Sequence, residues 1–220
     1  DTTIIRHFSI DNPSDVTFKL ESQVLINSDH RVEDAILDLA HELVHFVYKD
    51  SFNPYKKNFK VKDFILSTLE SKGGEIDAYL HECAVMSEIM QQRFANDDNC
   101  QSVYFSDSPK VSVLLSKKAF FQLGKFTEDF ISQLNAVNLR REDFPELNAN
   151  EARFISSAYK LPYPFAALKE YNQIMKKVCE NDFQRFEYLK RSPASNFAPS
   201  YKAQKAEHET RCHRFLLGLN

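Results

Sequence analysis

The feature that most constrains the fold is an uninterrupted helical pattern from Val32 to Tyr48, which contains the sequence His41-Glu42-Leu43-Val44-His45. Residues four apart lie on the same face of a helix, one turn above the other, so the two histidines can bind one metal ion together. No Pro or Gly interrupts the stretch, and Ser28 or Asp29 is the expected N-cap. A helix-period apolar stripe supports the prediction: Val32, Ile36, Leu39, Leu43 and Val47.

Two histidines need a further ligand to form a catalytic zinc site, which takes three protein ligands and a water. The residues that follow His45, from Phe46 to Ser51, contain neither Gly nor His. A third histidine in the arrangement H-E-x-x-H-x-x-G-x-x-H is therefore excluded. We expect the third ligand to be Glu75, which follows Gly73-Gly74 and begins an unbroken helical pattern that runs to Met90.

Two other residues of this second helix, His81 and Glu82, are alternative third ligands. Glu82 lies seven residues after Glu75, on nearly the same helix face. A short helix at about 62–71 and the glycine turn would allow the second helix to run antiparallel to the first. Because Glu42 lies between the two histidines, it is the expected general base towards a water on the metal.

The sequence His41-Glu42-x-x-His45 followed by Glu75-Ile76-Asp77-Ala78 resembles the gluzincin class of zinc metallopeptidases. The resemblance covers about residues 32–82, and no specific family is recognised over the rest. It implies Zn²⁺ as cofactor, His41, His45 and Glu75 as its ligands, and Glu42 as the catalytic base.

One residue departs from the pattern of that class. Tyr79 stands where several members have an aspartate that supports a ligand histidine. Asp77, Glu82 or Asp38 could take this supporting role.

The function predicted from these residues is hydrolysis of peptide bonds in a protein or peptide substrate, which could include cell-wall peptides. The alternatives are a catalytically silent metallopeptidase-like protein that regulates or binds partners, and a helical structural protein whose H-E-x-x-H is accidental. The intact Glu42 argues against the silent protein. Peptide hydrolysis also needs a donor to the oxyanion, and the sequence does not rank the candidates: Tyr79, Tyr104, Tyr159, Tyr163, Tyr201, His208 and His213.

The fold class expected is α+β and predominantly helical, with a small N-terminal antiparallel sheet packed on the H-E-x-x-H helix. Residues 3–10 and 16–27 are predicted strands, because β-branched residues are frequent and a turn-forming sequence separates them. We expect one domain over 1–220, with a zinc-binding half at 1–94 and a helical half at 95–220. Loops are predicted at 49–60 and 95–109, and further helices near 110–123, 126–138, 149–160, 164–191 and 200–217.

The composition bounds the partners. A net charge of −3 does not indicate nucleic-acid binding, and no apolar run approaches the roughly 18 residues that span a membrane. The four cysteines could form the sequence-local disulfides Cys83–Cys100 and Cys179–Cys212, or all remain reduced. The even cysteine count and the start at Asp1 rather than Met lead us to expect an exported, periplasmic or secreted, protein. Nothing in the sequence indicates an oligomeric state.

Overall fold

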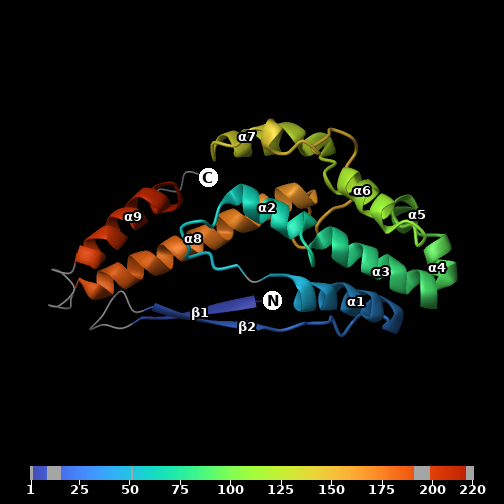
Figure 1. Cartoon of the computed structure of the whole chain (residues 1–220), viewed down its shortest axis with the longest axis horizontal. Coiled ribbons are helices and arrows are strands. Elements are labelled where there is room, and N and C mark those ends of the chain that lie inside the picture. Colours follow the sequence, from blue (N-terminus) through green and yellow to red (C-terminus); the bar gives the residue numbers. More distant parts are fainter. Residues whose placement is uncertain (1, 9–15, 51, 191–198, 217–220) are drawn as a thin grey trace. The chain divides into compact units, whose positions relative to one another are not determined.

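The computed structural model describes residues 2–8, 16–50, 52–190 and 199–216. The chain is mostly helical (62%) and has a two-stranded antiparallel sheet near its N-terminus (Figure 1), which confirms the predicted fold class; the packing of this sheet on the H-E-x-x-H helix stays a prediction. In the described part of the chain, no helix is long and apolar enough to cross a membrane.

The chain divides into two compact units. The first comprises Asp1–Gln23, Phe52–Phe59 and Glu170–Asn220, and the second comprises Val24–Ser51 and Lys60–Lys169. The sheet thus belongs to the first unit and the H-E-x-x-H helix to the second. A single domain with halves at 1–94 and 95–220 stays a prediction.

The second unit is helical. Its elements are α1 (Val32–Tyr48), α2 (Val61–Glu70), α3 (Glu75–Ile89), α4 (Gln91–Ala95), α5 (Asp98–Val103), α6 (Pro109–Phe120), the 3₁₀ turn η1 (Gly124–Phe126), α7 (Thr127–Asn135), the 3₁₀ turn η2 (Arg141–Asp143) and the start of α8 (Tyr163–Leu189).

Helix α1 buries a different face from the one its apolar stripe predicts. The stripe is exposed, with relative exposures from 36% at Ile36 to 72% at Val32. The buried residues are Leu37 and Val44, and Leu37 packs with Cys83, Met86 and Cys100. Leu37, His41 and Val44 follow one another at helical spacing, so the face of α1 that meets α3 is the face that carries the histidines.

The start of α1 also differs from the prediction. Its N-cap is Arg31, with extended backbone and no side-chain capping bond, rather than Ser28 or Asp29. Glu33 and Asp34 lie in the first turn, where their negative charges favour the helix dipole.

Two predicted segments of the second unit are wrong. The predicted loop 95–109 contains α5, because the Asp97 carboxylate accepts a hydrogen bond from the Cys100 amide (2.7 Å) and caps the helix. The predicted helix 149–160 is absent. Its backbone instead forms a bridge between Ile155 and the nearby Pro162, and the carbonyl oxygen of Asn150 accepts a hydrogen bond from the Gly124 amide (2.8 Å).

The first unit combines a hairpin with two helices. Strands β1 (Thr2–Phe8) and β2 (Val16–Ser22) pair antiparallel with Arg6 opposite Phe18. The second strand ends before the predicted 27, and residues 9 and 10 of the first prediction lie outside the described residues. Helix α9 (Pro199–Leu216) and the part of α8 from Glu170 complete this unit.

Both sequence-local disulfides are present, Cys83–Cys100 in the second unit and Cys179–Cys212 in the first. The first joins α3 to α5 and the second joins α8 to α9. Of the two alternatives left open by the sequence, the disulfides are therefore the one present, and they are consistent with an extracytoplasmic protein.

Candidate metal centre

Three side chains of the second unit converge at the point where α1 meets the start of α3. The Nε2 atom of His41 lies 3.4 Å from one carboxylate oxygen of Glu75, and the Nε2 atom of His45 lies 3.6 Å from the other. One ligand atom from each of the three residues falls within 4.8 Å of the others. The three residues could therefore hold a metal ion.

The spacing fits a tetrahedral zinc ion. Zinc lies about 2.0–2.2 Å from histidine nitrogen and carboxylate oxygen, so two ligand atoms in a tetrahedral arrangement are about 3.4 Å apart. The two nitrogen–oxygen distances, 3.4 and 3.6 Å, are close to this value, and they run to different oxygens of the same Glu75 carboxylate. Two histidines and one glutamate are also a donor set of catalytic zinc sites. The residues present thus fit a zinc ion.

The other nitrogen of each histidine has an acceptor of its own. The Nδ1 atom of His41 lies 3.2 Å from the Glu82 carboxylate, and the Nδ1 atom of His45 lies 2.7 Å from the carbonyl oxygen of Gly73. A carbonyl or carboxylate only accepts, so each imidazole donates from Nδ1, and its Nε2 atom faces Glu75. Such partners fix the ring orientation of histidines that bind metals.

The charges at this point favour a cation. Burial opposes the charged form of His41, but hydrogen bonds to Glu75 and Glu82, and the charges of both carboxylates, outweigh burial and raise its pKa to about 10. Burial likewise acts to raise the pKa of Glu75, yet the hydrogen bond from His41 and the nearby charges of His45, His41 and Lys49 lower it. Two carboxylates around two half-buried imidazoles create a negative potential that a divalent ion would satisfy.

The glycine turn shapes this centre directly. Gly73 has a positive φ of 74°, which side chains rarely tolerate. A Cβ atom there would lie 2.4 Å from the backbone nitrogen of Lys49, at the end of α1. The turn is held from the other side by Asp77, whose carboxylate accepts a hydrogen bond from the Gly73 amide (2.9 Å). Only glycine therefore lets the turn approach α1 closely enough for its carbonyl to meet His45.

The other proposed site residues lie as follows. His81 is exposed and its Nδ1 atom lies 2.9 Å from the Asp77 carbonyl of its own helix. Glu82 contacts the Nδ1 atom of His41, whereas Glu75 faces the Nε2 atom. Asp38 lies 2.7 Å from His30, and the Tyr79 hydroxyl lies 3.6 Å from Sγ of Cys100.

Among the oxyanion-donor candidates, Tyr163 is linked to this centre by its electrostatics. It is the first residue of α8, half-buried, with its ring 5.0 Å from that of Phe120. Burial raises the pKa of its hydroxyl, and the charges of Glu75, Glu82 and Glu42 raise it further. The hydroxyl is therefore protonated at neutral pH and able to donate.

The sequence alone does not specify two parts of this centre. The Gly73 carbonyl was not foreseen as a partner of His45, although the Gly73-Gly74 pair marked the turn. Tyr163 was one of seven candidates. Three of the others, Tyr201, His208 and His213, belong to the first unit, whereas the metal-centre residues belong to the second.

In comparisons with protein-family models, curated proteins and solved structures, no match to this chain was found.

Proposed function

We propose that this chain is a zinc-dependent metallopeptidase of the gluzincin type, with His41, His45 and Glu75 as metal ligands. The observation that carries the proposal is the pairing of each histidine through both nitrogens, with Nε2 towards Glu75 and Nδ1 towards Glu82 or Gly73. In an accidental H-E-x-x-H on a helix surface, the histidines would have no reason to find these partners outside their own helix.

The residues around the centre divide the work of hydrolysis. When bound, a zinc ion supplies Lewis acidity that makes a water nucleophilic near neutral pH and polarises the scissile carbonyl. Glu42 accepts the proton of the attacking water and passes it to the leaving amine. Tyr163 donates a hydrogen bond to the oxyanion that develops as the carbonyl is attacked. Glu82 and Gly73 position the two histidines.

The proposed substrates are proteins or peptides, with cell-wall peptides among them, outside the cytoplasm in the periplasm or medium. The disulfides support this location, since they persist in oxidising compartments. A silent metallopeptidase-like regulator is the alternative.

Two measurements test the proposal. The purified chain is expected to hold one zinc ion per molecule by elemental analysis, and to cleave members of a peptide library. Glu42→Gln should keep the zinc and lose cleavage, because the amide cannot accept the proton. Glu33→Gln makes the same charge change at an exposed position on α1 and should keep both.

The outcomes separate the alternatives. Zinc without cleavage by the wild type favours the silent regulator. Cleavage that survives in Glu42→Gln contradicts the mechanism. If the chain binds no divalent metal, both the peptidase and the silent regulator are contradicted, and the helical structural protein with an accidental H-E-x-x-H remains.

A further inference from the structure

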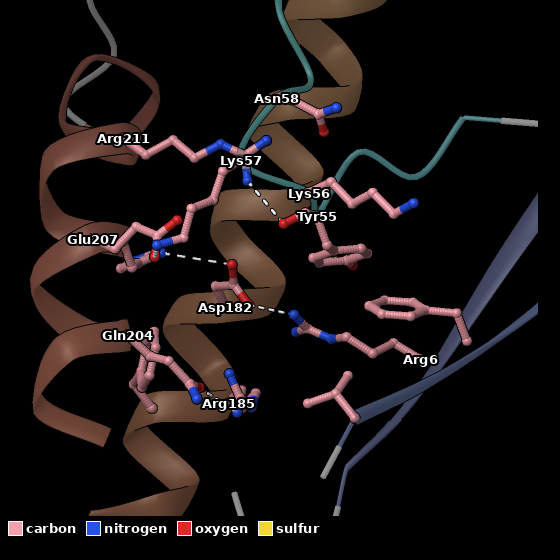
Figure 2. A pocket seen from close by; sticks show the side chains of 14 residues that line it. Arg6, Tyr55, Lys56, Lys57, Asn58, Asp182, Arg185, Gln204, Glu207 and Arg211 are labelled. Carbon is pink, nitrogen blue, oxygen red and sulfur yellow. Dashed lines mark hydrogen bonds and ion pairs between the residues drawn. The ribbon is translucent and has the colours of Figure 1, made fainter. Parts of the chain in front are cut away.

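A second candidate site lies in the first unit, apart from the residues of the metal centre. It is an open pocket of about 480 Å³, lined by residues of the hairpin, the 52–59 segment, α8 and α9 (Figure 2). Pockets of roughly 300–1,000 Å³ hold small-molecule ligands. We refer to it as the basic pocket.

Cations outnumber anions in its lining. Its charged residues are Arg6, Lys56, Lys57, Arg185 and Arg211 against Asp182 and Glu207, and five minus two leaves an excess of three positive charges. Asp182 pairs with Arg6, and Glu207 lies 2.7 Å from Lys57. Lys56 and Arg211 take part in neither of these two ion pairs.

Two of these arginines are held in place by neutral oxygen atoms. Arg185 is 6% exposed and donates from Nη2 to the side-chain oxygen of Gln204 (2.8 Å). Arg211 donates to the carbonyls of Pro54 (2.5 Å) and Tyr55 (3.3 Å). Since the carbonyl acceptors of Arg211 carry no formal charge, they hold its guanidinium group in place without cancelling its positive charge.

Buried among these groups is a histidine without a hydrogen-bond partner. His208 lines the pocket and is 7% exposed, and neither of its ring nitrogens has a partner among the described residues. The nearest carboxylate, that of Asp182, is 3.9 Å from Nδ1 and so beyond hydrogen-bonding distance. Buried polar groups normally have hydrogen-bond partners, so a buried imidazole without one indicates a ligand that would supply the missing hydrogen bond.

A disulfide and a cation–π contact tie the walls of the pocket together. The Cys179–Cys212 disulfide joins α8 to α9 close to the positions that line it. Arg6 lies on the same hairpin face as Phe8 and Phe18, with its guanidinium 4.0 Å from the Tyr55 ring centre. A pocket held in this way loses little conformational entropy on binding.

We propose that the basic pocket binds a small organic phosphate monoester. A phosphate monoester carries about −1.5 to −2 charges at pH 7 and three acceptor oxygens. A lining with an excess of three positive charges therefore favours this group over a carboxylate, which carries a single negative charge. His208 would donate one of its ring protons to a phosphate oxygen, and Lys56 would pair with the group from the rim. Phe18 and Phe186, which also line the pocket, offer apolar contact to the organic part.

Calorimetric titration of the full chain with phenyl phosphate tests this proposal. Lys56→Gln removes a rim charge, and His208→Phe removes the imidazole while keeping an aromatic ring beside Phe186. Each is expected to weaken binding about tenfold, the effect of one charge-assisted hydrogen bond. Lys19→Gln is the matched control, since Lys19 is exposed on β2, pairs with Glu21 and does not line the pocket. It should bind as the wild type does.

Further ligands sharpen the result. Benzoate should bind more weakly than phenyl phosphate, and raising the salt concentration should weaken both. Flotation with phosphatidate vesicles, competed by phenyl phosphate, tells whether the monoester can be a lipid headgroup. The proposal is overturned if phenyl phosphate does not bind, if benzoate binds equally well, or if both pocket variants bind as tightly as Lys19→Gln. Thermal melts confirm that each variant is folded.

Discussion

The Nδ1 atom of His45 lies 2.7 Å from the carbonyl oxygen of Gly73, 28 residues later in the chain. The contact joins the H-E-x-x-H helix to the turn before Glu75, so one glycine positions a histidine and starts the helix that carries the third candidate ligand. The centre therefore depends on backbone geometry as much as on its side chains.

Gly73→Ala should damage the metal centre. A Cβ atom would meet the Lys49 backbone nitrogen at 2.4 Å, and a side chain at this positive φ costs about 1–3 kcal/mol before that clash is relieved. We expect a lower midpoint of chemical unfolding and zinc affinity at least about tenfold weaker, because the Gly73 carbonyl must move away from His45.

The control for this change is Gly124→Ala. Gly124 also has a positive φ, 53°, but its nearest contact with a Cβ atom would be 3.2 Å, at Ala152. That variant should lose stability and keep its zinc affinity. Wild-type zinc affinity in Gly73→Ala would show that the turn does not position His45.

Glu82→Ala should weaken zinc binding without removing a proposed ligand. The Glu82 carboxylate accepts from Nδ1 of His41, and loss of such partners typically costs 10–100-fold in metal affinity. Competition with a chromophoric chelator measures this affinity. His81→Ala, one residue earlier and exposed, should bind zinc normally; equal affinities in the two variants would assign Glu82 no role at the centre.

Tyr163→Phe should slow catalysis and leave the zinc in place. Removing one donor to an oxyanion typically lowers kcat about 10²–10³-fold. The phenyl ring can still pack against Phe120, so the melting temperature should stay close to that of the wild type. Initial rates on a cleaved peptide give kcat and KM separately, and the effect is expected in kcat.

Tyr104→Phe provides the comparison for this variant. Tyr104 packs with the Leu37, Cys83, Met86 and Cys100 cluster, against Phe94, and its loss of a hydroxyl should not change the rate. If both tyrosine variants retained wild-type kcat, another group would have to stabilise the oxyanion.

The sequence predicted the parts of this protein that depend on local periodicity. Patterns among residues close together in the sequence predict helix α1, the glycine turn and the start of α3. The stripe from Val32 to Val47 was misleading, because periodicity identifies an apolar face but not the side on which the next helix packs. The partner of His41 stayed open for a similar reason, since choosing Glu82 requires the rotation of α3 about its axis.

Contacts between distant segments were beyond sequence reasoning. The segment 149–160 has a helical composition, yet the carbonyl oxygen of Asn150 accepts a hydrogen bond from the amide of Gly124, far back in the chain, and Ile155 forms a bridge with Pro162. The basic pocket combines residues from four segments, and a local helical spacing relates its lining residues only within α8 (Asp182, Arg185 and Phe186) and within α9 (Gln204, Glu207, His208 and Arg211).

His208 should make the stability of the protein depend on pH in mildly acidic solution. Burial lowers its pKa; Asp182 and Glu209 act against this shift, and Arg211 and Arg6 act with it. In the unfolded chain the imidazole takes up a proton near its ordinary pKa of about 6.5, whereas the native state resists protonation. The unfolded state therefore binds more protons, and stability is lost as the pH falls below about 6.5.

Urea unfolding of the wild type and His208→Phe between about pH 5 and 7.5, in phosphate-free buffer, isolates this contribution. The variant lacks the titrating group, so its stability relative to the wild type should rise as the pH falls. His213→Gln, at an exposed position of the same helix, should differ from the wild type by a constant amount over this range. A constant difference for His208→Phe would mean that the imidazole is charged as readily in the native protein as in the unfolded chain, which a buried ring without a hydrogen-bond partner among the described residues does not allow.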